Sequence, residues 1–162
     1  MLRIATIGVY GFDAAGFLQA LSGAEVRLVL DVRQRRGVRG SQYAWANSKR
    51  LQATLKNAGI AYEHHRELAP TTELRQLQYR EDARLGVGKR TRVELSTAYK
   101  QRYEAEILDH VDISRLVAAL PREGATALLC VERDPEACHR SLIAHRIAQQ
   151  ARASIVHLRP GI

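Results

Sequence analysis

Short apolar segments of strand length alternate along this chain with segments of helical periodicity. The apolar runs fall at residues 3–7, 26–30, 60–63, 126–131 and 154–158. Between the first two, Phe17 and Leu21 recur at helical spacing after Asp13, a good N-terminal cap. Apolar strands joined by helices are typical of parallel sheets covered on both faces. The sequence therefore predicts a three-layer α/β/α, Rossmann-like domain with a mostly parallel sheet of about five strands.

The remaining helices are predicted at residues 48–58, 73–81, 95–108, 113–120 and 135–152. Residues 66–93 are polar and arginine-rich and contain Pro70, Gly86 and Gly88. A segment of that kind is usually functional or flexible. A chain of 162 residues suits one domain. We therefore expect a single α/β domain over residues 1–162 with a basic insertion around 66–93, whose role as a lid, a subunit contact or a loose loop stays open.

Positive charge is abundant and clustered. The chain carries a formal net charge of +8, with arginines concentrated in residues 33–40 and cations again in residues 89–92. Such clusters attract nucleic acid or other phosphates, although a basic surface also serves solubility. No apolar run approaches the length of a membrane span, and residues 1–11 lack a signal-peptide pattern. We expect a cytoplasmic protein with no membrane partner and with Cys130 and Cys138 reduced.

Polar and titratable residues follow four of the predicted strands. In open α/β sheets, ligands bind outside the carboxyl ends of the strands, so these residues are expected to form one site. The candidate catalytic residues are Asp31, Glu132, Cys138 and His139. The candidate ligand-binding residues are Gly8, Tyr10, Arg33, Arg39, His64 and Arg140.

The stretch CVERDPEACHRS, residues 130–141, concentrates this chemistry. Asp134 and Pro135 predict a helix start, which would place Cys138 and His139 near its first turn. A helix N-terminus binds anions and lowers thiol pKa values, and Arg140 adds bidentate geometry for phosphate. Cys138 is alternatively a small buried residue, and Asp31 is alternatively the partner of an internal salt bridge with Arg33 or Arg140.

The spacing of the cysteines and glycines favours no cofactor and no metal. Zinc sites prefer closer cysteine pairs with a second pair elsewhere, whereas here seven residues separate Cys130 from Cys138; a reversible disulfide stays open. The glycines at positions 8, 11 and 16 do not fit a dinucleotide-binding pattern. The loop RQRRGVRG with Tyr43 and Trp45 suits contact with a nucleic-acid backbone and bases. Alternatively, it is a solvated basic loop, and Trp45 packs as a lid on the domain.

Four stretches, TIGVYG, DVRQRRGVRGSQYAW, LQATLKNAGIAYEHHRELAPT and LLCVERDPEACHRSLIA, occur in this order. They resemble the bacterial and archaeal "domain of unknown function 488" proteins, in a longer subgroup in which RGVRG follows the DVR motif. The resemblance implies an α/β domain with the DVR and Cys-His-Arg motifs at one site, and no activity.

Three functions compete. The first is an enzyme acting on or binding a phosphate-bearing small molecule or nucleic acid, with arginines on phosphate and Cys138 as a possible nucleophile. The second is a non-catalytic nucleic-acid-binding module using the arginine loops, and the third is a thiol-based redox sensor. We favour the first. The sequence predicts no oligomeric state.

Overall fold

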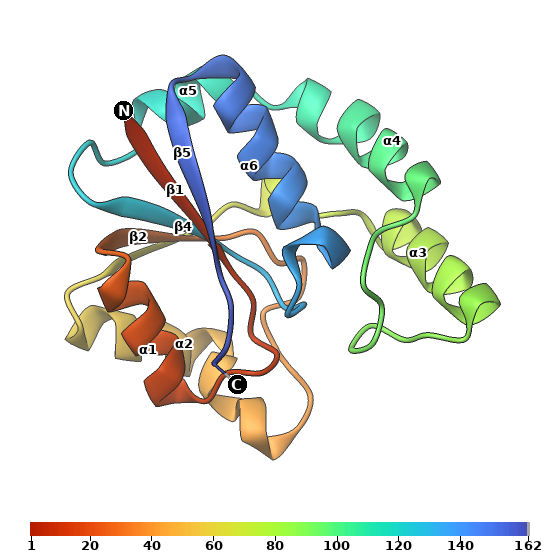
Figure 1. The fold of residues 1–162 in the computed structure, drawn as a ribbon, viewed down its shortest axis with the longest axis horizontal. Coiled ribbons are helices and arrows are strands. Elements are labelled where there is room, and N and C mark those ends of the chain that lie inside the picture. The colour runs from red at the N-terminus through yellow and green to blue at the C-terminus, as the bar shows by residue number, and fades with distance from the viewer. Residues whose placement is uncertain (162) are drawn as a thin grey trace.

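The computed structural model describes residues 1–161 and shows one five-stranded sheet with helices on both sides (Figure 1). The strands are β1 (Leu2–Ile7), β2 (Val26–Asp31), β3 (Ala61–His64), β4 (Ala125–Leu129) and β5 (Ala153–Leu158). All neighbouring pairs are parallel, in the order β3-β2-β4-β1-β5. The predicted three-layer architecture is confirmed.

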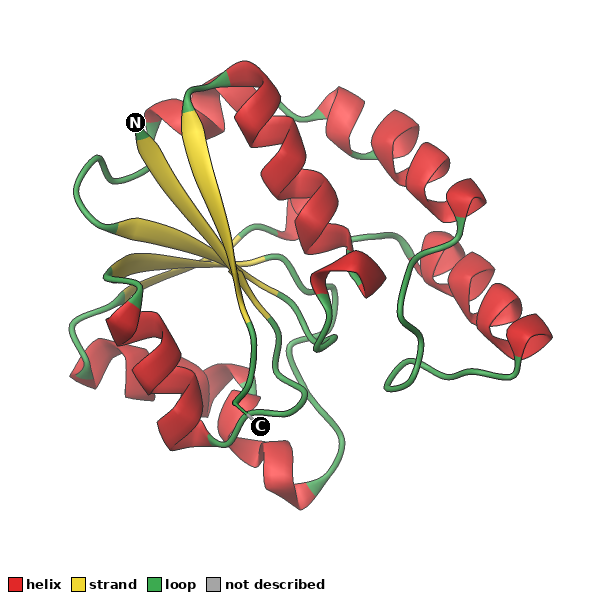
Figure 2. Cartoon of the chain, in the orientation of Figure 1, coloured by secondary structure: helices red, strands yellow, loops and turns green. Residues whose placement is uncertain are grey.

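The helices form two layers. They are α1 (Ala14–Gly23), α2 (Ser48–Asn57), α3 (Thr72–Leu85), α4 (Thr97–Glu106), α5 (Ile113–Ala118) and α6 (His139–Gln150). Figure 2 shows α1 and α2 on one side of the sheet and α5 and α6 on the other, with α4 packed on α6 and α3 packed on α4. Within residues 1–161, no helix is long and apolar enough to cross a bilayer.

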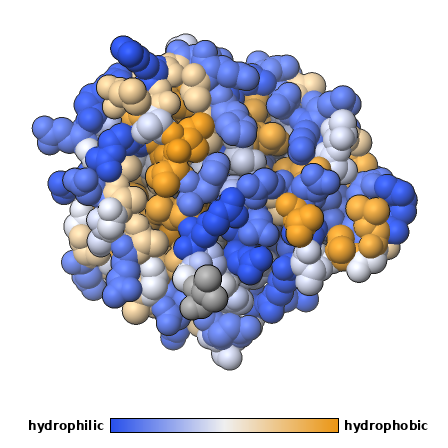
Figure 3. All heavy atoms as spheres, viewed as in Figure 1, coloured by the Kyte–Doolittle hydropathy of each residue, from blue (hydrophilic) through white to orange (hydrophobic). Residues whose placement is uncertain are grey.

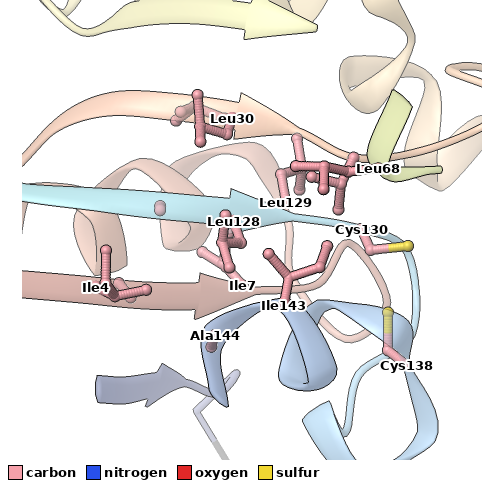
Figure 4. Close-up of a cluster of buried hydrophobic side chains, with 14 of the residues drawn as sticks. Ile4, Ile7, Leu30, Leu68, Leu128, Leu129, Cys130, Cys138, Ile143 and Ala144 are labelled. Carbon is pink, nitrogen blue, oxygen red and sulfur yellow. The ribbon is translucent and has the colours of Figure 1, made fainter. Parts of the chain in front are cut away.

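The central strands are buried, as their apolar sequences require. All of β4 is buried, and β1 and β2 each expose one residue, whereas the edge strands β3 and β5 alternate between covered and exposed positions. Figure 4 shows Ile4, Ile7 and Leu128 of the sheet facing Ile143 and Ala144 of α6. This packing holds the last residues of the central strands in place at the edge of the sheet where the following loops begin.

The segment 135–152 differs from its prediction as one helix. Pro135–Ala137 form a 3₁₀ turn, Cys138 is extended with φ −142°, and α6 begins only at His139. In a continuous helix the Ala137 carbonyl would accept the Ser141 amide, but the Nε of Arg92 occupies that carbonyl at 3.1 Å. The Ser141 amide bonds Cys138 instead. Cys138, not Asp134, is therefore the residue that precedes the helix.

The other helix boundaries differ modestly from their predictions, and three short 3₁₀ turns were not predicted. The helix in the insertion is longer than expected, because Thr71 caps it at one end and Gly86, at φ 72°, ends it at the other. Short 3₁₀ turns lie at Ser41–Ala46, Arg66–Leu68 and Leu108–His110.

Figure 3 shows a face dominated by hydrophilic side chains, with apolar patches over β5 and at the outer end of α3, where Val156 and Leu85 are exposed.

Candidate functional site

A pocket lies beyond the carboxyl ends of β2 and β4, where the connections that follow these two strands lead to opposite faces of the sheet. After β2 the chain continues to α2 on one face, and after β4 it continues to α6 on the other, so the two loops diverge beyond the carboxyl ends of adjacent strands. Such a switch point leaves a crevice where α/β proteins bind ligands. The pocket here measures about 640 Å³, a size typical of small-molecule sites. The segment between residues 70 and 99 closes its outer side.

Cys130, Cys138 and His139 gather at the floor of the pocket. Figure 4 shows Cys130 just after β4 and Cys138 just before α6, with the Cys138 sulfur pointing towards Cys130. One donor atom from each of the three residues lies within 4.8 Å of the other two. The Nδ1 of His139 is 3.7 Å from the Cys130 sulfur and 3.9 Å from the Cys138 sulfur. Both thiols are free and buried.

The His139 ring is oriented by the backbone. Its Nε2 is 2.8 Å from the carbonyl oxygen of Val32. A carbonyl oxygen can only accept, so Nε2 donates its hydrogen there and Nδ1 is left facing the two sulfurs. The Tyr103 ring packs against the imidazole, with 5.5 Å between centroids. The end of β2 thus fixes which nitrogen meets the cysteines.

The pKa values of the two thiols are shifted in opposite directions. Burial alone disfavours the Cys138 thiolate, but the Cys130 thiol, the Arg140 guanidinium and His139 together lower the pKa of Cys138 well below its ordinary value. Burial and the negative charge at Cys138 raise the pKa of Cys130 well above its ordinary value. Burial works against the His139 imidazolium, yet the Cys138 thiolate raises the pKa of His139. The surroundings therefore favour the thiolate at Cys138 over the thiolate at Cys130.

Glu132 and Arg92 form a buried network beside the cysteines. The guanidinium of Arg92 donates to Glu132 Oε1 at 2.7 Å and to Asp82 Oδ2 at 2.8 Å, and Gln78 on α3 donates to Asp82 at 2.8 Å. The other oxygen of Glu132 lies 3.6 Å from the Cys130 sulfur. Burial, followed by the charge at Cys138, raises the pKa of Glu132 despite Arg92. The network fastens the insertion to the loop after β4.

Asp31 and Arg33 form a closed internal pair at the end of β2. The Nε and Nη2 of Arg33 donate to the two Asp31 oxygens at 2.9 and 2.8 Å, and Nη1 donates to the Ala46 carbonyl at 2.9 Å. The Tyr62 hydroxyl donates to Asp31 at 2.6 Å. Arg33 is 1% exposed and Asp31 is fully buried. The internal salt bridge considered for Asp31 is present, with Arg33 rather than Arg140 as its partner.

Arg140 and Gly8 hold the loop after β4. Arg140 is fully buried, and its Nη1 and Nη2 donate to the carbonyls of Glu132 at 2.5 Å and Arg133 at 3.0 Å. A Cβ on Gly8 would lie 1.9 Å from the Glu132 oxygen, so only glycine allows this approach of β1 to the loop. Neither residue lines the pocket, although both were predicted as ligand contacts. Their positions favour a structural role.

The other predicted contacts divide between the pocket and its surroundings. Tyr10 and Arg39 line the pocket, whereas the His64 ring bonds the Arg33 carbonyl at 2.9 Å and does not line it. Trp45 packs on Phe17, with 4.9 Å between ring centroids, as the alternative of a packed tryptophan expected. The predicted residues brought together at the pocket are thus Tyr10, Arg33, Arg39, Glu132, Cys138 and His139.

Residues 13–147 match the family described as "Domain of unknown function DUF488". The chain belongs to this family. The match contains both motifs on which the resemblance was based, the DVR motif and the Cys-His-Arg motif. Searches of curated proteins and of solved structures found no match.

Sequence reasoning missed the part of this DUF488 site that the insertion and α4 supply. Gln78, Asp82 and Tyr99 were not singled out, and Arg92 was counted only within a basic cluster. A signal existed for two of them, since Gln78 and Asp82 stand one helical turn apart on a buried face of α3. Polar residues on a buried helical face are expected to have partners, and here the partner is Arg92.

Proposed function

We propose that this protein binds a phosphate-bearing small molecule of nucleotide size in the pocket at the carboxyl edge of the sheet, and that the whole chain acts as one domain around it. The observation that carries the proposal is a set of cations at the pocket without carboxylate partners. They are Arg35, Arg39, Arg75, Lys89 and Arg90.

The charges at the rim are uncompensated. Among the ion pairs formed within residues 1–161, none involves any of these five cations, whereas Arg33 and Arg92 deeper in the pocket pair with carboxylates. Like charges around one concavity repel each other and focus a positive potential on it. A phosphate group relieves that repulsion and accepts hydrogen bonds from arginine in bidentate geometry.

Aromatic rings lie beside the cations. The guanidinium of Arg90 is 5.0 Å from the centre of the Tyr10 ring and 5.6 Å from that of Tyr43. The two tyrosine rings are 5.3 Å apart. An aromatic surface next to clustered cations suits a base joined to a phosphate.

The bound molecule would face the candidate reacting groups. Glu132, Cys138 and His139 line the same pocket, which keeps an enzyme as the favoured class. Because the insertion closes the outer side, the pocket suits a small molecule better than a continuous strand. Nucleic-acid binding is the second candidate, favoured by the exposure of Arg35 and Arg39. Either function is expected in the cytoplasm, where thiols stay reduced.

Calorimetric titration with AMP, with adenosine and with a short single-stranded DNA tests the proposal. We expect AMP to bind and adenosine, which lacks the phosphate, to bind at least about tenfold more weakly. Arg39→Gln with Arg90→Gln should weaken AMP binding by about tenfold or more. Arg50→Gln with Arg152→Gln removes the same charge from exposed positions outside the pocket and should have little effect.

Two results would contradict the proposal. If the two double variants lost AMP affinity equally, the effect would be one of net charge and not of the pocket. If the DNA bound with steep salt dependence while AMP did not bind, the nucleic-acid module would be the better account.

A further inference from the structure

The donor atoms at the pocket floor are arranged as metal ligands are. A tetrahedral zinc ion with Zn–S of about 2.3 Å and Zn–N of about 2.0 Å keeps sulfur and nitrogen ligands about 3.5 Å apart and two sulfurs about 3.8 Å apart. Here the two S···N distances are 3.7 and 3.9 Å, and the sulfurs lie within 4.8 Å of each other. A shift of about 1 Å or less would bring all three donors to zinc.

The histidine is held as a metal-ligating histidine should be. Such residues donate their second ring nitrogen to a carbonyl or carboxylate, which directs the other nitrogen at the metal. His139 donates Nε2–H to the Val32 carbonyl at 2.8 Å and turns Nδ1 to both sulfurs. In a nucleophilic pair the imidazole would approach one thiol closely, whereas here Nδ1 is nearly equidistant from two.

We propose that Cys130, Cys138 and His139 bind a zinc ion whose fourth position opens into the pocket. Thiolate and imidazole ligands select zinc over magnesium or calcium. Two thiolates neutralise the charge of Zn²⁺, which suits a buried site. Three protein ligands with one open position is the arrangement of catalytic rather than structural zinc.

The surroundings agree with an open position. All three ligands line the pocket, so a fourth ligand from solvent or from a bound molecule reaches the ion from that side. Glu132, fixed by Arg92, lies 3.6 Å from the Cys130 sulfur, close to where a zinc-bound water would donate its hydrogen. This inference goes beyond the binding of phosphate, because the ion would contact the ligand directly.

Sequence spacing argued against zinc, but spacing along the chain does not show how the fold brings these residues together. Seven residues separate the two cysteines, yet the 3₁₀ turn at Pro135–Ala137 folds the chain back on itself. The break at Cys138 then sets two adjacent ligands, Cys138 and His139, at the start of α6. The third ligand comes from the end of β4, which the core holds in place.

Cobalt(II) titration of the reduced, chelator-treated full chain tests the site. We expect binding of about one Co²⁺ per chain, with the visible bands of tetrahedral cobalt and a sulfur-to-cobalt charge-transfer band, both abolished by added Zn²⁺. Cys130→Ser and Cys138→Ser should each remove roughly half of the charge-transfer intensity. His145→Gln, an exposed histidine of the same helix, should leave the spectrum unchanged.

A second measurement does not depend on the folding of variants. In the wild-type chain, Zn²⁺ should slow the alkylation of both cysteines by iodoacetamide. The proposal is overturned if reduced protein retains no cobalt or zinc, or if the cobalt spectrum survives in the double serine variant. It is also overturned if mild oxidation gives a reversible Cys130–Cys138 disulfide while zinc gives no protection.

The outcome is separable from that of the phosphate proposal. Arg39→Gln with Arg90→Gln should retain the full cobalt spectrum, because neither residue belongs to the ligand set. Loss of AMP binding with an intact cobalt site would leave the zinc site standing alone. AMP binding by a chain that retains no metal would support the phosphate proposal and overturn the zinc proposal.

Discussion

Arg33 and Arg35 stand two residues apart in one loop, yet Arg33 is 1% exposed and paired, while Arg35 is exposed and has no carboxylate partner within residues 1–161. The same contrast separates Arg140 from Arg39. The arginines in the most distinctive motifs are bonded internally, whereas Arg35 and Arg39 in the less distinctive loop are exposed and form no ion pair within residues 1–161. The distinctive motifs therefore supply the internal bonds that hold the site together, whereas the unpaired cations are the residues that we propose to bind the ligand.

The difference follows from the fold. The residues after β2 and β4 leave a sheet whose central strands are buried, so polar groups at those strand ends need internal partners. Arg33 donates hydrogen bonds to Asp31 and to the Ala46 carbonyl, and Arg140 donates hydrogen bonds to the loop carbonyls. The side chains of Arg35 and Arg39 are exposed, so solvent can satisfy their charges.

Arg33→Met should give the largest effect on stability. It leaves the Asp31 carboxylate buried without its ion-pair partner, which typically costs about 3–5 kcal/mol. Urea unfolding should show this loss, while Arg35→Met should stay within about 0.5 kcal/mol of the wild type. The comparison fails if both variants are equally stable. Asp31→Leu added to Arg33→Met should recover part of the loss, because no buried charge then remains.

Arg92→Met should have the next largest effect, and a local one. Both ion pairs of Arg92 are buried, so two carboxylates lose a partner, but opening of the insertion lets water reach them. We expect a loss of about 2–3 kcal/mol. Hydrogen exchange should show α3 losing protection while β1 and β4 keep theirs.

Arg84→Met, near the end of α3, is the matched control for Arg92→Met. Arg84 pairs with Glu81 at the surface, where such pairs contribute about 0–1 kcal/mol. Uniform loss of protection across the whole sheet in Arg92→Met would show that the insertion is not a separate unit. Unchanged exchange in α3 would show that Arg92 does not fasten it.

The sheet was predictable because its signal is local. Apolar strand runs and helical spacing depend on a few neighbouring residues, and the five strands appear where those runs lie. The break before α6 was not predicted, and one of the contacts there is long-range: Arg92, 45 residues away along the chain, donates to the Ala137 carbonyl. The local Asp134–Pro135 signal contains no information about such a contact.

The site was predicted by position better than by role. The rule that ligands bind at the carboxyl ends of strands assigned Glu132, Cys138 and His139 to one edge of the sheet, and all three line one pocket there. Side-chain chemistry alone could not show that Arg140 would donate to backbone carbonyls, since that depends on the path of the loop. The closeness of Cys130 to His139 depends on the same loop.

His157 offers a smaller test, because it reports the charge of a buried arginine. Burial, followed by the positive charge of Arg140, lowers the pKa of His157, which bonds Thr6 at 2.7 Å. The other charged groups that act on it are Glu136, which raises the pKa, and Arg159 and His145, which lower it. In the unfolded chain His157 has an ordinary pKa of about 6.5, so the unfolded state takes up its proton first as pH falls.

The stabilising contribution of neutral His157 is therefore complete above about pH 6.5 and is lost as pH falls towards the lower pKa of the folded state. The urea midpoint of the wild type should fall more than that of His157→Gln between about pH 7.5 and 5.5. The difference is expected to be small, because His157 is only partly buried. An equal fall in both proteins, or a steeper fall in the variant, would mean that burial and the Arg140 charge do not lower the pKa of His157 in the folded state.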